Sequence, residues 1–348
     1  MFSNPFPKLV HQLPSTYPSM IQYIFSLLFT SSVEGRLSTR SLNQYMVGVH
    51  NLNPHRSYSM SIDSPFADVS WDEFRHTVLM SPQECSATSM KNRRSFRWSS
   101  DTIPDAIDWR DQGIVFPVKD QGQCGSCYSF SSTGALEAHH NIKYGSSTTD
   151  STQVAFFKPL SEQQILDCSQ NFDNHGCDGG LPSHVFEYVH YQGGIDDDGS
   201  YPYEMKSDGR CRFQSSHIAV RTTSSFNITE NDEESIKHIV ATIGPVSVAF
   251  EVMDDFMLYS NGIYSSDKCR DTVTDVNHAV LIVGYGTDPV DGPYWIVKNS
   301  WGTSWGEDGY FRIARGKNMC GIAVCASYPI LDSDNVEDQI AATDVMIE

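Results

Sequence analysis

The chain has 348 residues, of which 39% are hydrophobic, so it is long enough and apolar enough to fold into two domains with substantial cores. Its 24 Lys and Arg residues are outnumbered by 43 Asp and Glu residues, and the formal net charge is -19. This acidic excess, with no basic stripe in the sequence, excludes a nucleic-acid backbone as the partner.

An apolar run near the start of the chain, residues 21–29, is typical of the hydrophobic region of a signal peptide. The run is too short to cross a bilayer, so we expect no stable membrane insertion. Met20 directly precedes it, which indicates either a translation start at Met20 or an N-terminus assigned too early. The alternative is that the run is a buried part of a propeptide.

Residues 1–102 differ in composition from the rest of the chain. They are rich in Ser, Met and Arg and lack a regular strand pattern. We therefore expect a removable prosegment, and we expect the mature protein to begin near residues 103–110.

A cysteine stands where the first helix of the mature part is expected to begin. Phe130, Gly134, Ala138 and Ile142 recur every four residues after Cys127 and give this helix a narrow packing face. A thiol at a helix N-terminus faces the positive end of the backbone dipole, which stabilises its thiolate. Cys127 is therefore a candidate nucleophile.

The rest of the chain changes from a helical pattern to a strand pattern. Ser161-Glu-Gln-Gln has the form of a capping box and predicts a second helix. Beyond residue 217, short apolar segments separated by Gly and Pro turns predict a β-barrel-like domain. Its predicted strands cover residues 246–250, 279–285, 294–298 and 310–314. Residues 331–348 hold six acidic residues and no Lys or Arg, which predicts a solvated, disordered tail.

Three segments together resemble the papain family of cysteine peptidases. They are Gln121-Gly-Gln-Cys-Gly-Ser-Cys-Tyr128, Asn277-His278 and Asn299-Ser300-Trp301. Tyr128 departs from the Trp usual after the nucleophile, and we expect activity to survive because both are large rings with a polar edge. The resemblance implies an α+β, papain-like fold of two domains with the active-site cleft between them. The helical left domain would cover residues 103–216 and the β-barrel-like right domain residues 217–330.

The resemblance also implies a role for each residue of the site. Cys127 would attack the peptide carbonyl, its pKa lowered from ~8.5 to roughly 3 to 4 by an imidazolium and the helix dipole. His278 would protonate the leaving amine and then activate water, and Asn299 would orient the His278 ring. Gln121 would donate its amide to the oxyanion, and Trp301 would shield the bond between Asn299 and His278 from water. The alternative for His278 is a histidine of the core.

Small residues are expected to bind the substrate backbone. Gly179 and Gly180, in Gly176-Cys-Asp-Gly-Gly180, would let an extended peptide approach and pair with the enzyme. The alternative is an ordinary Gly-rich turn.

Two stretches of the prosegment resemble the inhibitory prosegment of this family. Arg36, Asn43, Val47 and Asn51 keep part of the spacing of its long helix. Phe66-Ala-Asp68 resembles the short motif that follows that helix. The resemblance therefore implies inhibition of the enzyme by its own prosegment.

The nine cysteines are an odd number, so one thiol stays free if the other eight pair, and Cys127 is the obvious free one. Sequence alone leaves the connectivity open. By resemblance the pairs are Cys124–Cys177, Cys168–Cys211 and Cys269–Cys320, which leaves Cys85 and Cys325. Such disulfides predict a secretory route, and the sequon at Asn227 predicts N-glycosylation.

Cys85 lies in Ser81-Pro-Gln-Glu-Cys-Ser-Ala-Thr88, and this segment resembles the mini-chain of the cathepsin H branch. A disulfide to Cys325 would retain residues 81–88 in the mature enzyme. Cleavage after Thr88 would create a carboxylate that pairs with the α-ammonium of a substrate. The resemblance therefore implies an aminopeptidase with some endopeptidase activity. The alternative for residues 81–88 is an ordinary prosegment loop.

The cathepsin H resemblance implies no cofactor and no metal, and a monomer in a lysosome or an equivalent acidic vacuole, with secretion from the cell as an alternative. The implied partners are peptide and protein substrates, the prosegment and mini-chain of the chain itself, and cystatin-type inhibitors. Two other functions remain open. A cathepsin L-like endopeptidase would cleave N-blocked substrates, whereas a non-catalytic peptide-binding homologue would have a Cys127 that does not react with active-site electrophiles.

Overall fold

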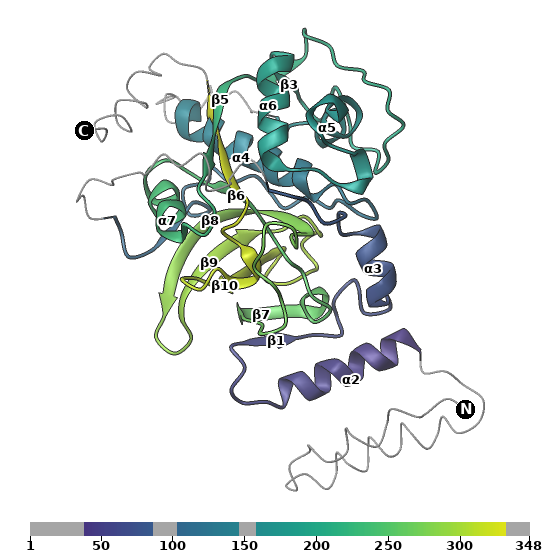
Figure 1. Ribbon diagram of the computed structural model, residues 1–348, viewed down its shortest axis with the longest axis vertical. Helices are drawn as coiled ribbons and strands as arrows, with labels where there is room; N and C mark the ends of the chain where they lie inside the picture. The colour runs from purple at the N-terminus through teal and green to yellow at the C-terminus, as the bar shows by residue number, and fades with distance from the viewer. Residues whose placement is uncertain (1–37, 86–102, 146–157, 332–348) are drawn as a thin grey trace, which may run out of the picture.

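The computed structural model describes residues 38–85, 103–145 and 158–331. Figure 1 shows the helices α4, α5 and α6 together in the upper part of the molecule and most of the strands in the lower part. No helix among the described residues is long and apolar enough to cross a membrane. The expectations for the apolar run 21–29, for Arg36, for Thr88 and for nearly all of the acidic tail concern residues outside these ranges.

The helical half is built around one long buried helix. Its helices are α4 (Cys127–Tyr144), α5 (Glu162–Cys168) and α6 (Pro182–Gln192), with the 3-10 turns η6 (Gln170–Phe172) and η7 (Gly176–Asp178) and the strands β3 (Ile195–Asp196) and β4 (Ile218–Val220). Ser161 caps α5, because its Oγ accepts a hydrogen bond from the Gln164 amide at 3.0 Å. Small residues on α4 allow its close packing, so it is buried from Cys127 to His139.

The other half is one large sheet. Its strands are β1 (Tyr58–Met60), β2 (Ile107–Asp108), β5 (Thr222–Ile228), β6 (Val246–Phe250), β7 (Tyr259–Tyr264), β8 (His278–Asp288), β9 (Gly292–Lys298), β10 (Tyr310–Ala314) and β11 (Ala326–Leu331). They follow the order β1-β7-β10-β9-β8-β6-β11-β5, with β2 paired to β8. Helix α7 (Glu233–Thr242) and the 3-10 turns η8 (Phe256–Leu258) and η9 (Met319–Gly321) complete this half. The sheet places His278 at the first residue of β8.

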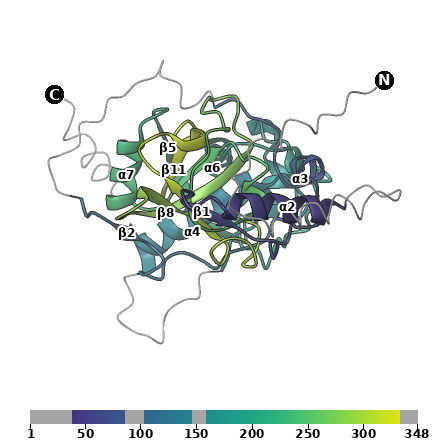
Figure 2. The ribbon, with the colours of Figure 1, turned by 90° about the horizontal axis from the view of Figure 1, so that it is seen from below.

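Residues 38–85 form a separate unit that lies on both halves. It contains α2 (Thr39–Asn51), β1 and α3 (Trp71–Thr77). Strand β1 adds to the edge of the sheet by pairing antiparallel with β7, with Tyr58 opposite Gly262. Gly262 has a φ of +97°, and a Cβ there would lie 2.7 Å from the Tyr58 Cα, so a larger residue would disturb this pairing. Figure 2 shows α2 and β1 side by side.

Two asparagines, the buried Asn43 and the exposed Asn51, connect the helix α2 to the chain that follows it. Asn43 donates from Nδ2 to the carbonyl oxygens of Ala67 and Val69, at 2.9 and 3.2 Å. Asn51 both donates to and accepts from the backbone of Met60. Asn43 and Asn51, two of the residues that keep the spacing of the inhibitory helix, thus bond α2 to the rest of the prosegment.

A buried charge cluster joins the helical half to the sheet. Lys119 donates to Glu137 Oε1 at 3.0 Å and to Glu162 Oε1 at 2.7 Å. Lys298, the last residue of β9, lines the same cavity with Asn299, and burial lowers its pKa to about 8. Paired charges satisfy one another at this junction. The cluster therefore lies beside Asn299, between α4 and the end of β9.

Some elements differ from the sequence expectations. The predicted strands 246–250 and 310–314 coincide with β6 and β10, while β8 extends beyond both of its predicted ends and β9 begins before its predicted start. The sequence analysis missed α6, α7, β5, β7 and β11. Strand β7 escaped it because the polar run Ser260-Asn261-Gly262 hides the alternation, and β11 continues to Leu331, where the tail was expected to begin.

Candidate active site

The thiol of Cys127 lies at the start of α4, between the two halves. Ser126 occupies the N-cap position, and the Cys127 Sγ accepts a hydrogen bond from the Ala279 amide of β8 at 3.3 Å. The side chain is fully buried, with 0% exposure. Cys127 is the free cysteine, because the other eight are paired.

The tautomer of His278 follows from its hydrogen bonds. Asn299 Oδ1 accepts from the Ser300 amide at 2.9 Å, so this atom is an oxygen and cannot donate. It lies 2.8 Å from His278 Nε2, which must therefore carry the proton. His278 Nδ1 has no hydrogen-bond partner within the described part of the chain. The ring thus keeps one basic nitrogen available for proton transfer.

Trp301 covers the imidazole of His278. The two ring centroids are 4.6 Å apart, and Trp301 is only 2% exposed. Two prosegment rings pack edge-on against the same indole, Phe66 at 5.5 Å and Phe74 at 5.2 Å. The motif Phe66-Ala-Asp68 therefore contacts the site directly, because Phe66 packs against the indole that lies over His278.

The side-chain amide of Gln121 is held by hydrogen bonds at both its nitrogen and its oxygen. Its Nε2 donates to the Val78 carbonyl oxygen of the prosegment and to the Cys124 carbonyl oxygen, each at 2.8 Å. Ser300 fixes the other end of the amide, because its hydroxyl donates to Gln121 Oε1 at 2.6 Å. The prosegment thus accepts one hydrogen bond from the side-chain amide of Gln121 through the Val78 carbonyl oxygen.

Residues 78–85 run past the thiol with their backbone bonded on both sides. On the sheet side, the amides of Met80, Gln83 and Cys85 donate to the carbonyl oxygens of Asn277, Val276 and Val273, at 3.1, 3.1 and 3.2 Å. On the helical side, the Ser81 amide donates to the Asp178 carbonyl oxygen at 3.0 Å. The segment therefore lies between the two halves as an added extended chain.

The two glycines next to this segment have different constraints. A Cβ on Gly179 would lie 2.8 Å from the Met80 Cβ, so Gly179 permits the close approach of the prosegment chain. A Cβ on Gly180 would instead collide with Asn174 and Tyr128, inside the helical half. Gly179 lies against the bound chain, whereas Gly180 is required for internal packing.

Burial favours the uncharged forms of Cys127 and His278 in this closed form. Burial raises the pKa of the Cys127 thiol to about 12 and lowers the pKa of His278 to about 4. The sequence analysis expected a thiol pKa of roughly 3 to 4, and the structure differs because residues 78–80 remove the site from water.

Four disulfides connect the chain around the site. They are Cys124–Cys177, Cys168–Cys211, Cys269–Cys320 and Cys85–Cys325. The last joins the prosegment to the mature part, with a Cα–Cα distance of 5.6 Å and a sequence separation of 240 residues. It keeps the end of the described prosegment beside η9 and β11.

A thiol at a helix start, an oriented imidazole and an amide donor are the parts that acyl transfer needs. A family profile described as papain family cysteine protease matches residues 103–330. The chain belongs to the papain family of cysteine proteases. Its papain-like, two-domain α+β fold agrees with the expectation from sequence.

The papain-family relatives include several plant thiol proteases. A thiol protease aleurain-like protein of Arabidopsis thaliana is 49% identical over 79% of this chain and 72% of its own length. A pro-cathepsin H of Medicago truncatula is 48% identical over 79% of this chain and 74% of its own length.

Two solved proforms of the papain family have the same fold. The digestive procathepsin L2 proteinase of Tenebrio molitor larval midgut is 37% identical, has a TM-score of 0.74, and matches 90% of this chain and 100% of its own. A recombinant stem bromelain precursor is 30% identical, has a TM-score of 0.73, and matches 91% of this chain and 100% of its own.

Sequence reasoning missed the residues that hold Gln121 in place. Ser300 was part of a recognised triplet, but its bond to Gln121 spans 179 positions and leaves no local signal. The same is true of Val78, which bonds to Gln121 from 43 positions away, and of Tyr203.

We predict that acid weakens the closed form through His278. The imidazole pKa is ~6.5 in an unfolded chain and about 4 here. Between these pH values, His278 is therefore protonated in the unfolded chain but neutral in the closed form. Stability is therefore lost as the pH falls through this window, by up to ~3 kcal/mol for this group. Denaturant unfolding of the Cys127→Ser proform across this range measures the loss.

The matched variant is Cys127→Ser with His278→Gln, which keeps every other titrating group. Its free energy of unfolding should fall less steeply with pH. Equal slopes for the two proteins would contradict the assignment of a buried neutral imidazole.

Proposed function

We propose that this papain-family protease is a cathepsin H-like aminopeptidase with some endopeptidase activity, and that Cys127, His278, Asn299 and Gln121 carry the reaction. The observation that supports the aminopeptidase activity is the disulfide between Cys85 and Cys325. A bond from the prosegment to the mature part outlasts removal of the prosegment, so it can retain a short peptide in the cleft.

In the open site, Cys127 and His278 exchange a proton to give a thiolate and an imidazolium. Removal of residues 78–80 restores water to the site, which removes the burial that raises the thiol pKa and lowers the imidazole pKa. The positive end of the α4 dipole then favours the thiolate. Asn299 holds the imidazole by accepting from Nε2, so the proton that moves is on Nδ1.

Acylation forms a bond between the Cys127 sulfur and the carbonyl carbon of the substrate. The carbonyl oxygen becomes an oxyanion, to which Gln121 Nε2 and the Cys127 backbone N–H donate. Collapse of this intermediate breaks the C–N bond, and the His278 Nδ1 proton passes to the leaving amine. The products are a free amine and a thioester on Cys127.

Deacylation reverses the roles of the same groups. Neutral His278 accepts a proton from water as the water oxygen attacks the thioester carbonyl, and the oxyanion again accepts from Gln121. The C–S bond then breaks, and the carboxylic product leaves with the thiolate restored. Trp301 keeps water away from the bond between His278 and Asn299 during both steps.

The mini-chain supplies the selectivity for free N-termini. Cleavage after Thr88 would create a carboxylate whose reference pKa of ~3.5 keeps it ionised in a mildly acidic compartment. Residues 81–85 already lie along the cleft, bonded to Asp178 on one side and to Val276 and Val273 on the other. A peptide held there attracts an α-ammonium and excludes longer chains from the same half of the cleft.

The cathepsin L-like alternative has one observation in its favour, the similarity to the Tenebrio molitor procathepsin L2 proteinase. It predicts an open cleft after maturation and no preference for free N-termini. A non-catalytic homologue would instead leave Cys127 unreactive toward electrophiles.

The compartment we propose is a lysosome or an equivalent acidic vacuole, with a monomeric enzyme acting on peptides and proteins. The four disulfides support an oxidising secretory route. Asn227 is exposed on the edge strand β5, where a glycan would have room. Acid also favours release of the prosegment through His278.

We predict that Cys127→Ser and His278→Ala each lower peptide hydrolysis by about three to six orders of magnitude. Asn299→Ala should be milder, because it disturbs only the orientation of the imidazole. The measurement is kcat/KM of the matured variants, with thermal unfolding as the control for folding. Near-normal turnover by Cys127→Ser would refute the assigned nucleophile.

We predict that Cys85→Ser, or deletion of Pro82 to Thr88, changes the substrate preference. Hydrolysis of a free N-terminal substrate should fall about ten- to hundredfold, as expected for loss of one charge-assisted hydrogen bond, and cleavage of its N-acylated form should rise. The measurement is the ratio of kcat/KM for the two substrates.

The matched control is Glu84→Gln, which keeps the disulfide and removes an exposed carboxylate from the same segment. Its ratio should equal that of the wild type. An unchanged ratio in Cys85→Ser, with the mini-chain found by mass in the wild type, would contradict the mechanism.

A further inference from the structure

We propose that Tyr203 is a positioning residue for oxyanion stabilisation, acting through the backbone carbonyl of Gln121. The inference rests on the proposed role of Gln121, but it is independent of the choice between aminopeptidase and endopeptidase, because both use the same oxyanion.

The hydroxyl of Tyr203 links Gln121 to the start of the catalytic helix. It lies 2.8 Å from the Gln121 carbonyl oxygen and 2.7 Å from Ser126 Oγ. A carbonyl oxygen can only accept, so Tyr203 donates its single proton to Gln121, and Ser126 must donate to Tyr203. The chain of donors runs from the residue before Cys127 to the residue that faces the oxyanion.

Every other polar atom of Gln121 is also held. Its backbone amide donates to the Ser300 carbonyl oxygen at 2.9 Å, and its Oε1 accepts from the Ser300 hydroxyl at 2.6 Å. Both contacts lie on the side of the sheet. Tyr203 supplies the contact from the helical half, so the peptide unit that follows Gln121 is held between the two halves.

Two further contacts hold the same segment. Met205 Sδ accepts from the Gln123 amide at 3.3 Å, and the Met205 side chain fills the space beside Gly122. The Tyr203 ring packs edge-on against Phe130 of α4, with centroids 5.0 Å apart. The loop that carries Tyr203 thus contacts both the Gln121 segment and the helix α4.

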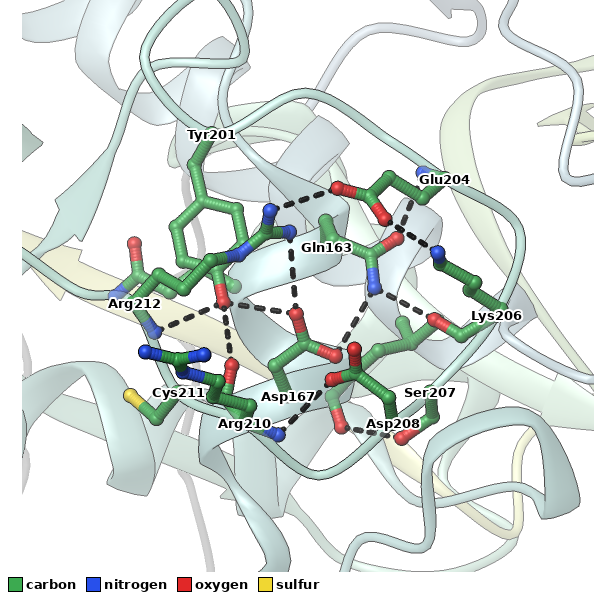
Figure 3. Close-up of polar contacts among 12 residues, drawn as sticks. Gln163, Asp167, Tyr201, Glu204, Lys206, Ser207, Asp208, Arg210, Cys211 and Arg212 are labelled. Carbon is green, nitrogen blue, oxygen red and sulfur yellow. Dashed lines mark hydrogen bonds and ion pairs between the residues drawn. The ribbon is translucent and has the colours of Figure 1, made fainter.

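The loop itself is bonded to α5 through Gln163 and Asp167, as Figure 3 shows. Gln163 bonds to the backbone at Glu204 and Lys206, at 2.8 and 2.6 Å. Tyr201 donates to the buried carboxylate of Asp167 at 2.8 Å.

Arg212 and a disulfide complete the attachment. The Arg212 guanidinium lies 4.6 Å above the Tyr201 ring and pairs with Glu204 at 2.8 Å. Cys168, the last residue of α5, is bonded to Cys211. A hydroxyl on a loop fixed in this way can hold a backbone position that a mobile loop could not.

Tyr203→Phe tests the proposal, because it removes the hydroxyl and keeps the ring. We expect kcat to fall about three- to tenfold with KM unchanged. This is the loss expected when one hydrogen bond, from the misplaced Gln121 amide to the oxyanion, is weakened in the transition state. The alkylation rate of Cys127 by iodoacetamide should stay the same, because that reaction forms no oxyanion. The matched control is Tyr188→Phe, which removes a buried tyrosine hydroxyl that bonds to Gln164 instead, and it should leave kcat unchanged.

The decisive measurement is a double-mutant cycle with Gln121→Ala. If Tyr203 acts through Gln121, Tyr203→Phe should cause no further loss of kcat in the Gln121→Ala protein. The same factor in both backgrounds, or no loss in the single variant, would overturn the proposal.

The cycle separates two kinds of failure. If Gln121→Ala has no effect, the proposed role of Gln121 fails and the inference fails with it. If Gln121→Ala lowers kcat but the two losses multiply, only the inference fails. Should Tyr203→Phe not fold, Ser126→Ala removes the donor on the other side of the same hydroxyl, and a smaller loss that vanishes with Gln121→Ala is expected. A loss that persists would overturn the proposal.

Discussion

Burial of Cys127 and His278 beneath residues 78–80 is the constraint on which this proform depends. Burial raises the pKa of the thiol to about 12 and lowers the pKa of the imidazole to about 4, so it favours the neutral form of both groups. The same segment occupies the amide of Gln121 with the Val78 carbonyl. The prosegment therefore both covers the pair and favours its uncharged form.

In the proform, the prosegment covers the site by pairing with the edge of the sheet and by bonding to the backbone of both halves. Strand β1 extends the sheet at β7, residues 78–85 extend the backbone bonding between the two halves, and Phe66 and Phe74 cover Trp301. Most of these contacts are lost together when the prosegment leaves. The disulfide from Cys85 is the exception, since a covalent bond survives cleavage of the chain on either side of it. One segment can thus serve first as part of the inhibitor and later, as we propose, as part of the substrate site.

The sequence predicted what is encoded locally. Cys127 was found because its flanking residues resemble the signature of the papain family and a helix pattern begins at it, and β6 and β10 because apolar residues cluster within a few positions. The contacts that hold Gln121 could not be found in this way, because they join residues 43, 82 and 179 positions apart. The thiol pKa was predicted for a solvated site. In the proform the direction of its shift is reversed, because the thiol is buried. A motif therefore identifies the reacting groups, while their state depends on tertiary contacts.

The most direct test of this account is the protonation state of His278 and Cys127, measured by nitrogen and carbon NMR on labelled proform and matured enzyme at neutral pH. The account predicts a proform with a neutral thiol and a neutral imidazole that is protonated on Nε2 alone. It predicts a thiolate and an imidazolium protonated on both nitrogens after maturation. An imidazolium and a thiolate already present in the proform would contradict the central claim that the prosegment keeps the pair uncharged.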